Sequence, residues 1–235
     1  MRSTLGQFAE VETEGDFVLQ NERLLKVRLR QGEIYARKGA MVAYQGEVQF
    51  EHASSGAKRM MKKMATGENV SLMKIGGSGE AFLADTAQNI QVLYLENEGI
   101  TVNSRNLLAF DSDIQWDIKK VAGGTSGMMA GGLFNTSLQG TGAVAIVSDG
   151  PPVLLDVGSA PTFADAQAAI TWSGGVETSL KVQAKAKSLI GMGSGESIQM
   201  AFSGQGWVLV QPSEGRAVID GSAGGGSGLS GLLPI

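Results

Sequence analysis

A weak internal repeat with a period of about 64 residues constrains the fold of this chain more than any other feature of its sequence. A Gly-x-Gly triplet opens a strand-like run three times, at intervals of 63 and 64 residues: 77–79, 140–142 and 204–206. An aromatic residue before a turn recurs in the same rhythm, at intervals of 66 and 62 residues: Tyr44, Phe110 and Trp172. Repeats of this size indicate one supersecondary unit that is copied and packed around an axis. We therefore expect three units related by rotation, with the three aromatic residues at equivalent positions near the core.

The segments between these markers have the pattern of short antiparallel strands. Apolar and basic residues alternate from Leu25 to Arg30, which is typical of a half-buried strand. The 34 glycines stand between short apolar runs, as in tight turns and bulges, and argue against a helical bundle. We predict one all-β domain over residues 17–220, with pseudo-equivalent units at about 17–76, 77–139 and 140–203. The last strands, within 204–220, would close it into a pseudo-threefold barrel like a double-stranded β-helix. Residues 1–16 should be irregular and the Gly/Ser-rich tail 221–235 flexible.

Composition excludes several classes of function. With a net charge of −4, the chain lacks the basic surface that is typical of a DNA-binding protein. The absence of cysteine excludes disulfides, zinc–thiolate sites and thiol chemistry. The N-terminus has no apolar leader, and no apolar run approaches the roughly 18 residues of a membrane span. These features predict a cytoplasmic protein, with peripheral membrane contact as an alternative.

No catalytic constellation accompanies the repeat. The single histidine, His52, stands beside Glu51, whereas a metal site or a Ser-His-Asp site needs partners that the sequence does not supply. Two carboxylate pairs have the i, i+2 spacing that puts both groups on one face of a strand: Asp111 with Asp113, and Glu96 with Glu98. We interpret them as solvated turn charges rather than as acid/base pairs. The Gly-x-Gly triplets precede strands rather than helices, so they are not phosphate-binding loops. We expect no enzymatic activity, bound metal or cofactor.

Three segments between the strands carry the clearest remaining signal. Each has an apolar, glycine-flanked tip with lysines nearby, and equivalent places in a repeat should project from the same end of the molecule. The expected interaction face consists of Met60, Met61, Met64, Met128, Met129, Phe134 and Met192, and the expected basic patch of Lys58, Arg59, Lys62 and Lys63. Such methionines pack against the barrel, contact another subunit or face an anionic membrane. No aromatic residue lies within the basic patch, which argues against RNA binding.

Several motifs together resemble the altered-inheritance-of-mitochondria family of TRAP-like β proteins. The resemblance covers about residues 15–220 and depends on the order and spacing of these stretches: 39–44, 77–84, 107–111, 127–134 followed by 140–142, 169–172 and 202–206. The resemblance implies an antiparallel β fold built from three pseudo-equivalent units, and it places the chain in the bacterial branch of the family. The mitochondrial members of this family are linked to inner-membrane organisation. The resemblance supplies no catalytic residues, and a fold label does not imply RNA binding. The sequence thus predicts a non-enzymatic binding or scaffold protein that self-associates, with peripheral membrane association as an alternative. An RNA-binding or small-molecule-binding barrel is a third class.

Overall fold

The fold was analysed in a computed structural model that describes residues 3–52, 71–120, 134–182 and 198–213. These residues form strands and two short 3-10 helices, Leu5–Phe8 and Ser104–Asn106. The strands are β1 (Phe17–Asn21), β2 (Leu24–Arg37), β3 (Met41–His52), β4 (Leu72–Leu83), β5 (Asn89–Asn103), β6 (Leu107–Asp111), β7 (Gln115–Lys120), β8 (Phe134–Ser148), β9 (Val153–Asp156), β10 (Thr162–Asp165), β11 (Ala169–Ser173), β12 (Val176–Val182), β13 (Ile198–Gly204) and β14 (Trp207–Val210). The all-β prediction is confirmed.

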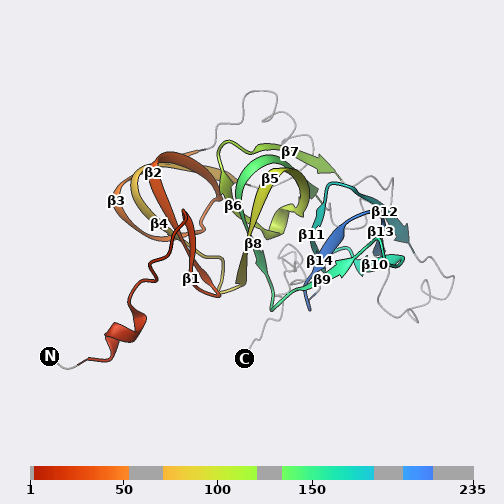
Figure 1. The fold of residues 1–235 in the computed structure, drawn as a ribbon, viewed down its shortest axis with the longest axis horizontal. Helices are drawn as coiled ribbons and strands as arrows, with labels where there is room; N and C mark the ends of the chain where they lie inside the picture. Colours follow the sequence, from red (N-terminus) through yellow and green to blue (C-terminus); the bar gives the residue numbers. More distant parts are fainter. Residues whose placement is uncertain (1–2, 53–70, 121–133, 183–197, 214–235) are drawn as a thin grey trace, which may run out of the picture.

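The strands form two antiparallel sheets. The larger follows the order β3-β4-β2-β6-β8-β5-β11-β14-β9, with β1 beside β2 and β7 beside β8, and the smaller follows β10-β13-β12. We call β2–β4 the first unit, β5–β8 the second and β9–β14 the third. Figure 1 shows the units side by side, with the first at the left and the third at the right. Three hydrophobic clusters follow one another along this row, the first built mainly on β2 and β4 and the last entirely on the third unit.

The three aromatic residues of the repeat pair with residues at the same position relative to the Gly-x-Gly triplets. Tyr44 pairs with Ala81, Phe110 with Val144 and Trp172 with Val208. Each partner lies two residues after the second glycine of its Gly-x-Gly triplet. A β-bulge also interrupts each pairing two residues before the aromatic, at Val42, Leu108 and Ile170. The sequence period therefore corresponds to a recurring pairing register.

The environments of the three aromatic residues differ, and here the expectation for Tyr44 is wrong. Phe110 and Trp172 are 0% and 3% exposed, whereas Tyr44 is 52% exposed. Phe110 and Trp172 lie on strands with a neighbour on both sides, but β3 is the end of the larger sheet. The described strands also do not close into a barrel, because β3 and the third unit lie at opposite ends of the molecule (Figure 1).

The Gly-x-Gly triplets do not open strands as expected. Those at 77–79 and 140–142 lie inside β4 and β8, and the third spans the junction of β13 and β14. A Cβ at Gly77 would lie 2.2 Å from the carbonyl oxygen of Glu47, and one at Gly79 would lie 2.1 Å from that of Gln45. Gly77 and Gly79 therefore allow close backbone approach between β3 and β4 at mid-strand.

Candidate functional site

The predicted interaction face and basic patch lie outside the described residues. This applies to the methionines at 60, 61, 64, 128, 129 and 192 and to the basic residues at 58, 59, 62 and 63. For Phe134 the backbone is described, as the first residue of β8, where it pairs with Lys120. The expected convergence of the three segments and the role of their methionines stay predictions. His52 is the last residue of β3 and pairs with Met73 through the backbone.

The carboxylate pairs occupy positions with structural roles. Asp111 ends β6, is half-buried and accepts a hydrogen bond of 2.7 Å from the backbone N–H of Ala143 on β8. Burial raises the pKa of Asp111, against the lowering effect of that hydrogen bond. Glu96 and Glu98 are exposed and flank a bulge at Asn97, whose φ is 60°. The exposure of Glu96 and Glu98 agrees with their interpretation as solvated turn charges, whereas Asp111 is a half-buried group with a structural hydrogen bond.

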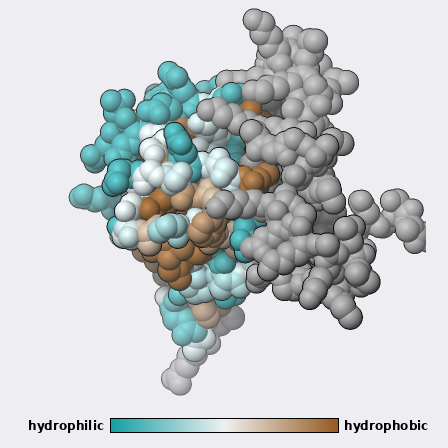
Figure 2. Space-filling model, turned by 90° about the vertical axis from the view of Figure 1, so that its right-hand side faces the viewer, coloured by the Kyte–Doolittle hydropathy of each residue, from teal (hydrophilic) through white to brown (hydrophobic). Residues whose placement is uncertain are grey.

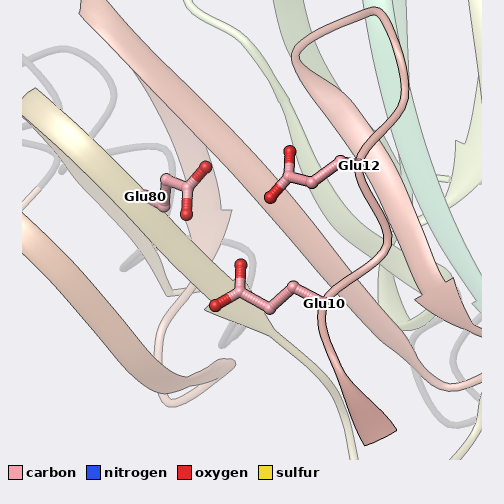
Figure 3. Close-up of side chains that lie close together, drawn as sticks. All are labelled: Glu10, Glu12 and Glu80. Carbon is pink, nitrogen blue, oxygen red and sulfur yellow. The ribbon is translucent and has the colours of Figure 1, made fainter. Parts of the chain in front are cut away.

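The most densely charged group in the described part of the chain surrounds Lys26. The Lys26 ammonium lies 3.0 Å from Glu10, 2.8 Å from Glu12 and 3.4 Å from Glu80, and its side chain is 0% exposed. Arg28 also contacts Glu12 and Glu80. Figure 3 shows the carboxylates of the N-terminal segment and of β4 converging over β2. We call this group the Lys26 cluster.

The charges of the Lys26 cluster compensate one another. Burial alone would lower the pKa of Lys26, but hydrogen bonds from its ammonium to Glu12 and Glu10 outweigh that effect and raise it. The hydrogen bond with Lys26 is the main cause that lowers the pKa of Glu12. Oxygen atoms of the three glutamates lie within 4.8 Å of one another, a spacing that a hard cation could use. Because the ammonium already lies among these oxygens, we assign the cluster to anchoring the N-terminal segment.

Sequence reasoning missed this cluster. Alternation along β2 placed Lys26 on a solvent-facing side, and the segment before Phe17 was expected only to be irregular. A usable signal was present, because Glu10 and Glu12 have the same two-residue spacing as Lys26 and Arg28. Gln20 fixes the segment further through two hydrogen bonds with the backbone of Val11, of 2.8 Å and 3.1 Å.

The N-terminal segment should detach in acid. Glu12 has a folded pKa below its ordinary value of 4.5, so its contribution is complete above that value and is lost as the pH falls through the folded pKa. Lys26 has a folded pKa above 10.5, so its contribution is complete below that value and is lost only in strong alkali. We expect the amide resonance of Val11 to move toward its random-coil position as the pH falls below 4.5, while β-sheet resonances stay in place.

Substitution should reproduce the acid effect at neutral pH. Lys26→Met removes the only ammonium of the cluster and should free Val11 at about pH 7. Glu14→Gln, a change in the same segment outside the cluster, is the matched control and should leave the Val11 resonance unchanged. An unshifted Val11 resonance in Lys26→Met would show that the cluster does not anchor the segment.

Large apolar side chains are exposed at both ends of the row of units. On β3, the exposed fractions are 58% for Val42, 52% for Tyr44 and 37% for Phe50, and the rings of Tyr44 and Phe50 are 5.3 Å apart. The third unit exposes Val153, Leu154 and Phe163 by 57%, 62% and 47%. Figure 2 views the molecule from the end of the third unit and shows a continuous hydrophobic area there. Apolar surfaces of this kind mark interaction sites more often than free surface.

Comparisons with known proteins agree with the fold. Within the described segments, no helix combines the length and the apolar character needed to cross a bilayer. Among solved structures, the crystal structure of a protein from Streptococcus pyogenes is similar, with a TM-score of 0.68 and 22% sequence identity over 83% of this chain and 91% of that one. This likeness concerns the fold alone. A comparison with curated proteins found no match.

The family assignment rests on the sequence. A family model described as mitochondrial biogenesis AIM24 matches residues 17–213. That span begins with β1 and extends just past β14, so it includes every described strand. The resemblance inferred from the repeat motifs is therefore confirmed, and the chain belongs to the AIM24 family.

Proposed function

We propose that this protein is a non-enzymatic scaffold or binding protein that associates with copies of itself. The observation that carries the proposal is the exposed apolar surface at both ends of the row of units. Val42 and Tyr44 lie on one end, and Val153 and Leu154 on the other, all more than half exposed. A solvated strand edge with apolar side chains is a template for pairing with another chain. Self-association would remove both apolar surfaces from water.

The charged groups support a non-enzymatic role. The Lys26 cluster binds the N-terminal segment, and Asp111 binds the backbone of β8. Each of these groups already has a structural partner, which supports a structural role for both. Membrane association through the methionine-bearing segments stays a prediction, because those segments lie outside the described residues.

The size of the protein in solution tests the proposal. We expect the wild-type chain to sediment above its monomer mass of 24.4 kDa and to dissociate on dilution. Tyr44→Asp places a charge on the exposed end of β3 and should shift the population toward monomer at the same concentration. The matched control is Tyr94→Asp, because Tyr94 is 63% exposed but lies on β5 in the middle unit. A wild-type protein that stays monomeric up to its solubility limit would contradict self-association.

A further inference from the structure

We propose that the outer face of β2 is a binding site for an extended acidic peptide of a partner protein, and that the chain's own N-terminal segment occupies this site in the structure. The partner would carry two carboxylates two residues apart, as Glu10 and Glu12 are, and would displace the N-terminal segment when it binds. The inference concerns the first unit alone, so it goes beyond the proposed self-association and does not depend on it.

Three basic side chains stand at successive outward positions of β2. Lys26, Arg28 and Arg30 alternate with Val27 and Leu29, which are 0% and 3% exposed and belong to the core. Alternate residues of a strand share one face of the sheet, so the three basic residues form a row on the other face. We call this row the β2 strip. An extended peptide has the same two-residue period, so carboxylates at every second position would match the strip.

The N-terminal segment supplies carboxylates along the β2 strip. The Lys26 ammonium contacts Glu10 and Glu12. At the other end of the strip, Nε of Arg30 lies 3.1 Å from Oδ1 of Asp16. The contacts therefore advance along β2 in the same direction as along the segment. Asp16 directly precedes β1, so its contact belongs to the domain, and the carboxylates of a partner would face the Lys26 end of the strip.

The site also holds the backbone of the N-terminal segment. The side-chain amide of Gln20 on β1 accepts a hydrogen bond of 2.8 Å from the Val11 N–H and donates one of 3.1 Å to the Val11 carbonyl oxygen. The Arg28 guanidinium donates to the carbonyl oxygens of Thr13 and Gly15. Every peptide offers these main-chain atoms. A phosphate offers no amide N–H to Gln20, so the site fits a peptide better than a lipid headgroup or a nucleic-acid backbone.

The β2 strip belongs to the family domain, whereas the segment that covers it lies outside the family match. The AIM24 model matches residues 17–213, and strand pairing begins at Phe17. The 3-10 helix at the start of the segment lies away from the sheets (Figure 1), with Leu5 and Phe8 67% and 75% exposed. Gly15, with a φ of 103° and open space around it, is a position where the backbone can turn away from β2. The segment can therefore leave the strip without breaking a strand.

The contacts of the N-terminal segment are of a kind that a partner can replace. The side chains of Glu10 and Glu12 are 39% and 65% exposed, and ion pairs with exposed carboxylates are weak and screened by salt. Departure of the segment would open the outer face of β2 to water, so Lys26 would be hydrated rather than left buried without a partner. The tether gives the segment an effective concentration of about a millimolar, which a partner must overcome by affinity or concentration.

Peptide binding to the full chain tests the inference. The probe is a fluorescent, amidated peptide of residues 4–13, whose anisotropy reports binding. Glu10→Gln/Glu12→Gln, the loosened variant, should release the segment and bind the probe about tenfold or more tightly than the wild type, because its site is no longer occupied. Glu14→Gln changes a carboxylate of the segment outside the Lys26 cluster and is the matched control. It should bind the probe as weakly as the wild type does.

Two changes separate a specific site from general charge attraction. Arg28→Gln in the loosened variant should weaken probe binding by about tenfold or more. Arg23→Gln removes the same charge at the turn between β1 and β2 and should weaken it by less than about twofold. A probe in which Glu10 and Val11 are exchanged has the same composition but adjacent carboxylates, and it should also bind about tenfold or more weakly.

A measurement on the wild-type chain keeps the test independent of the loosened variant's folding. Unlabelled probe at several times the effective concentration of the segment, about a millimolar, should move the Val11 amide resonance toward its random-coil position. The β-sheet resonances should stay in place, because the probe replaces only the segment. An unmoved Val11 resonance at that concentration would overturn the inference.

The remaining outcomes also decide the question. A folded loosened variant whose Val11 resonance stays in place would show that the two carboxylates do not hold the segment. A released segment without probe binding would mean that the contact only anchors the segment. Equally tight binding of the exchanged probe or of single-stranded oligouridylate would mean that the strip attracts any polyanion. Each of these results would overturn the inference, and none of them bears on the mass of the protein in solution, so the proposed self-association would still stand.

Discussion

Replacing Phe110 with alanine should destabilise the protein by about 3–5 kcal/mol, whereas the same change at Tyr44 should alter its stability by less than about 0.5 kcal/mol. The two residues hold the same repeat position and pair in the same register. Phe110 is 0% exposed, and its ring centroid lies 5.3 Å from Tyr35 and 6.2 Å from Trp116. Its removal leaves a cavity, while the ring of Tyr44 is half in solvent.

Urea unfolding checks this prediction at a concentration where the chain is monomeric. Both variants should keep the wild-type dependence of unfolding free energy on urea, so that the midpoint reports stability. Trp172→Ala is a second comparison, because Trp172 is 3% exposed and packs against Phe202 at 5.6 Å. If Tyr44→Ala lowered the free energy of unfolding as much as Phe110→Ala, Tyr44 would be buried in the isolated chain, for instance by closure of the barrel.

Gly77→Ala should lower the free energy of unfolding by about 3 kcal/mol or more. We expect it to be one of the most destabilising additions of a single methyl group in the sheet. Gly77 has a φ of 115°, and its added Cβ would lie 2.2 Å from the backbone oxygen of Glu47. The neighbouring atom belongs to the backbone of β3, so relief would require the β3–β4 pairing to shift.

Gly32→Ala is the matched control. Gly32 lies on β2 in the same sheet, has no atom within 4 Å of an added Cβ and does not have a left-handed φ. Its stability should change by less than about 1 kcal/mol. Thermal unfolding of both variants measures the difference, and equal melting temperatures would refute the close approach at Gly77.

The sequence period predicted the pairing register because the constraint behind it is local. A glycine is required where an added Cβ would collide with an atom of the neighbouring strand, as at Gly79, Gly142 and Gly206, and the aromatic residue lies at a fixed distance from the same contact. Such short-range requirements leave a mark in a single sequence. Whether Tyr44 is buried or exposed could not be predicted in this way, because that depends on whether another strand lies beside β3. The sequence of β3 has the same form whether or not that neighbour is present.

Lys26 illustrates a second limit. Alternation with Leu25 and Val27 correctly placed the apolar side chains in the core, both at 0% exposure. The same rule put Lys26 on the outer face, where it indeed lies. Its burial comes from the N-terminal segment crossing that face, a tertiary contact held by charge that has no periodic signal. Sequence patterns therefore identified which face of β2 each residue occupies but not what covers that face.

The recurrence of one junction register has a consequence for how such chains can change in evolution. The second unit begins and ends at junctions of the same kind, with Tyr35 opposite Phe110 on one side and Thr101 opposite Trp172 on the other. Deletion of that unit would bring Tyr35 to Trp172 in the same register, and duplication would add one more identical step. Neither change would alter the terminal strands of the larger sheet, β3 and β9. The length of the row can therefore vary by whole units through gene duplication or loss, while chains of different length keep the same pair of ends.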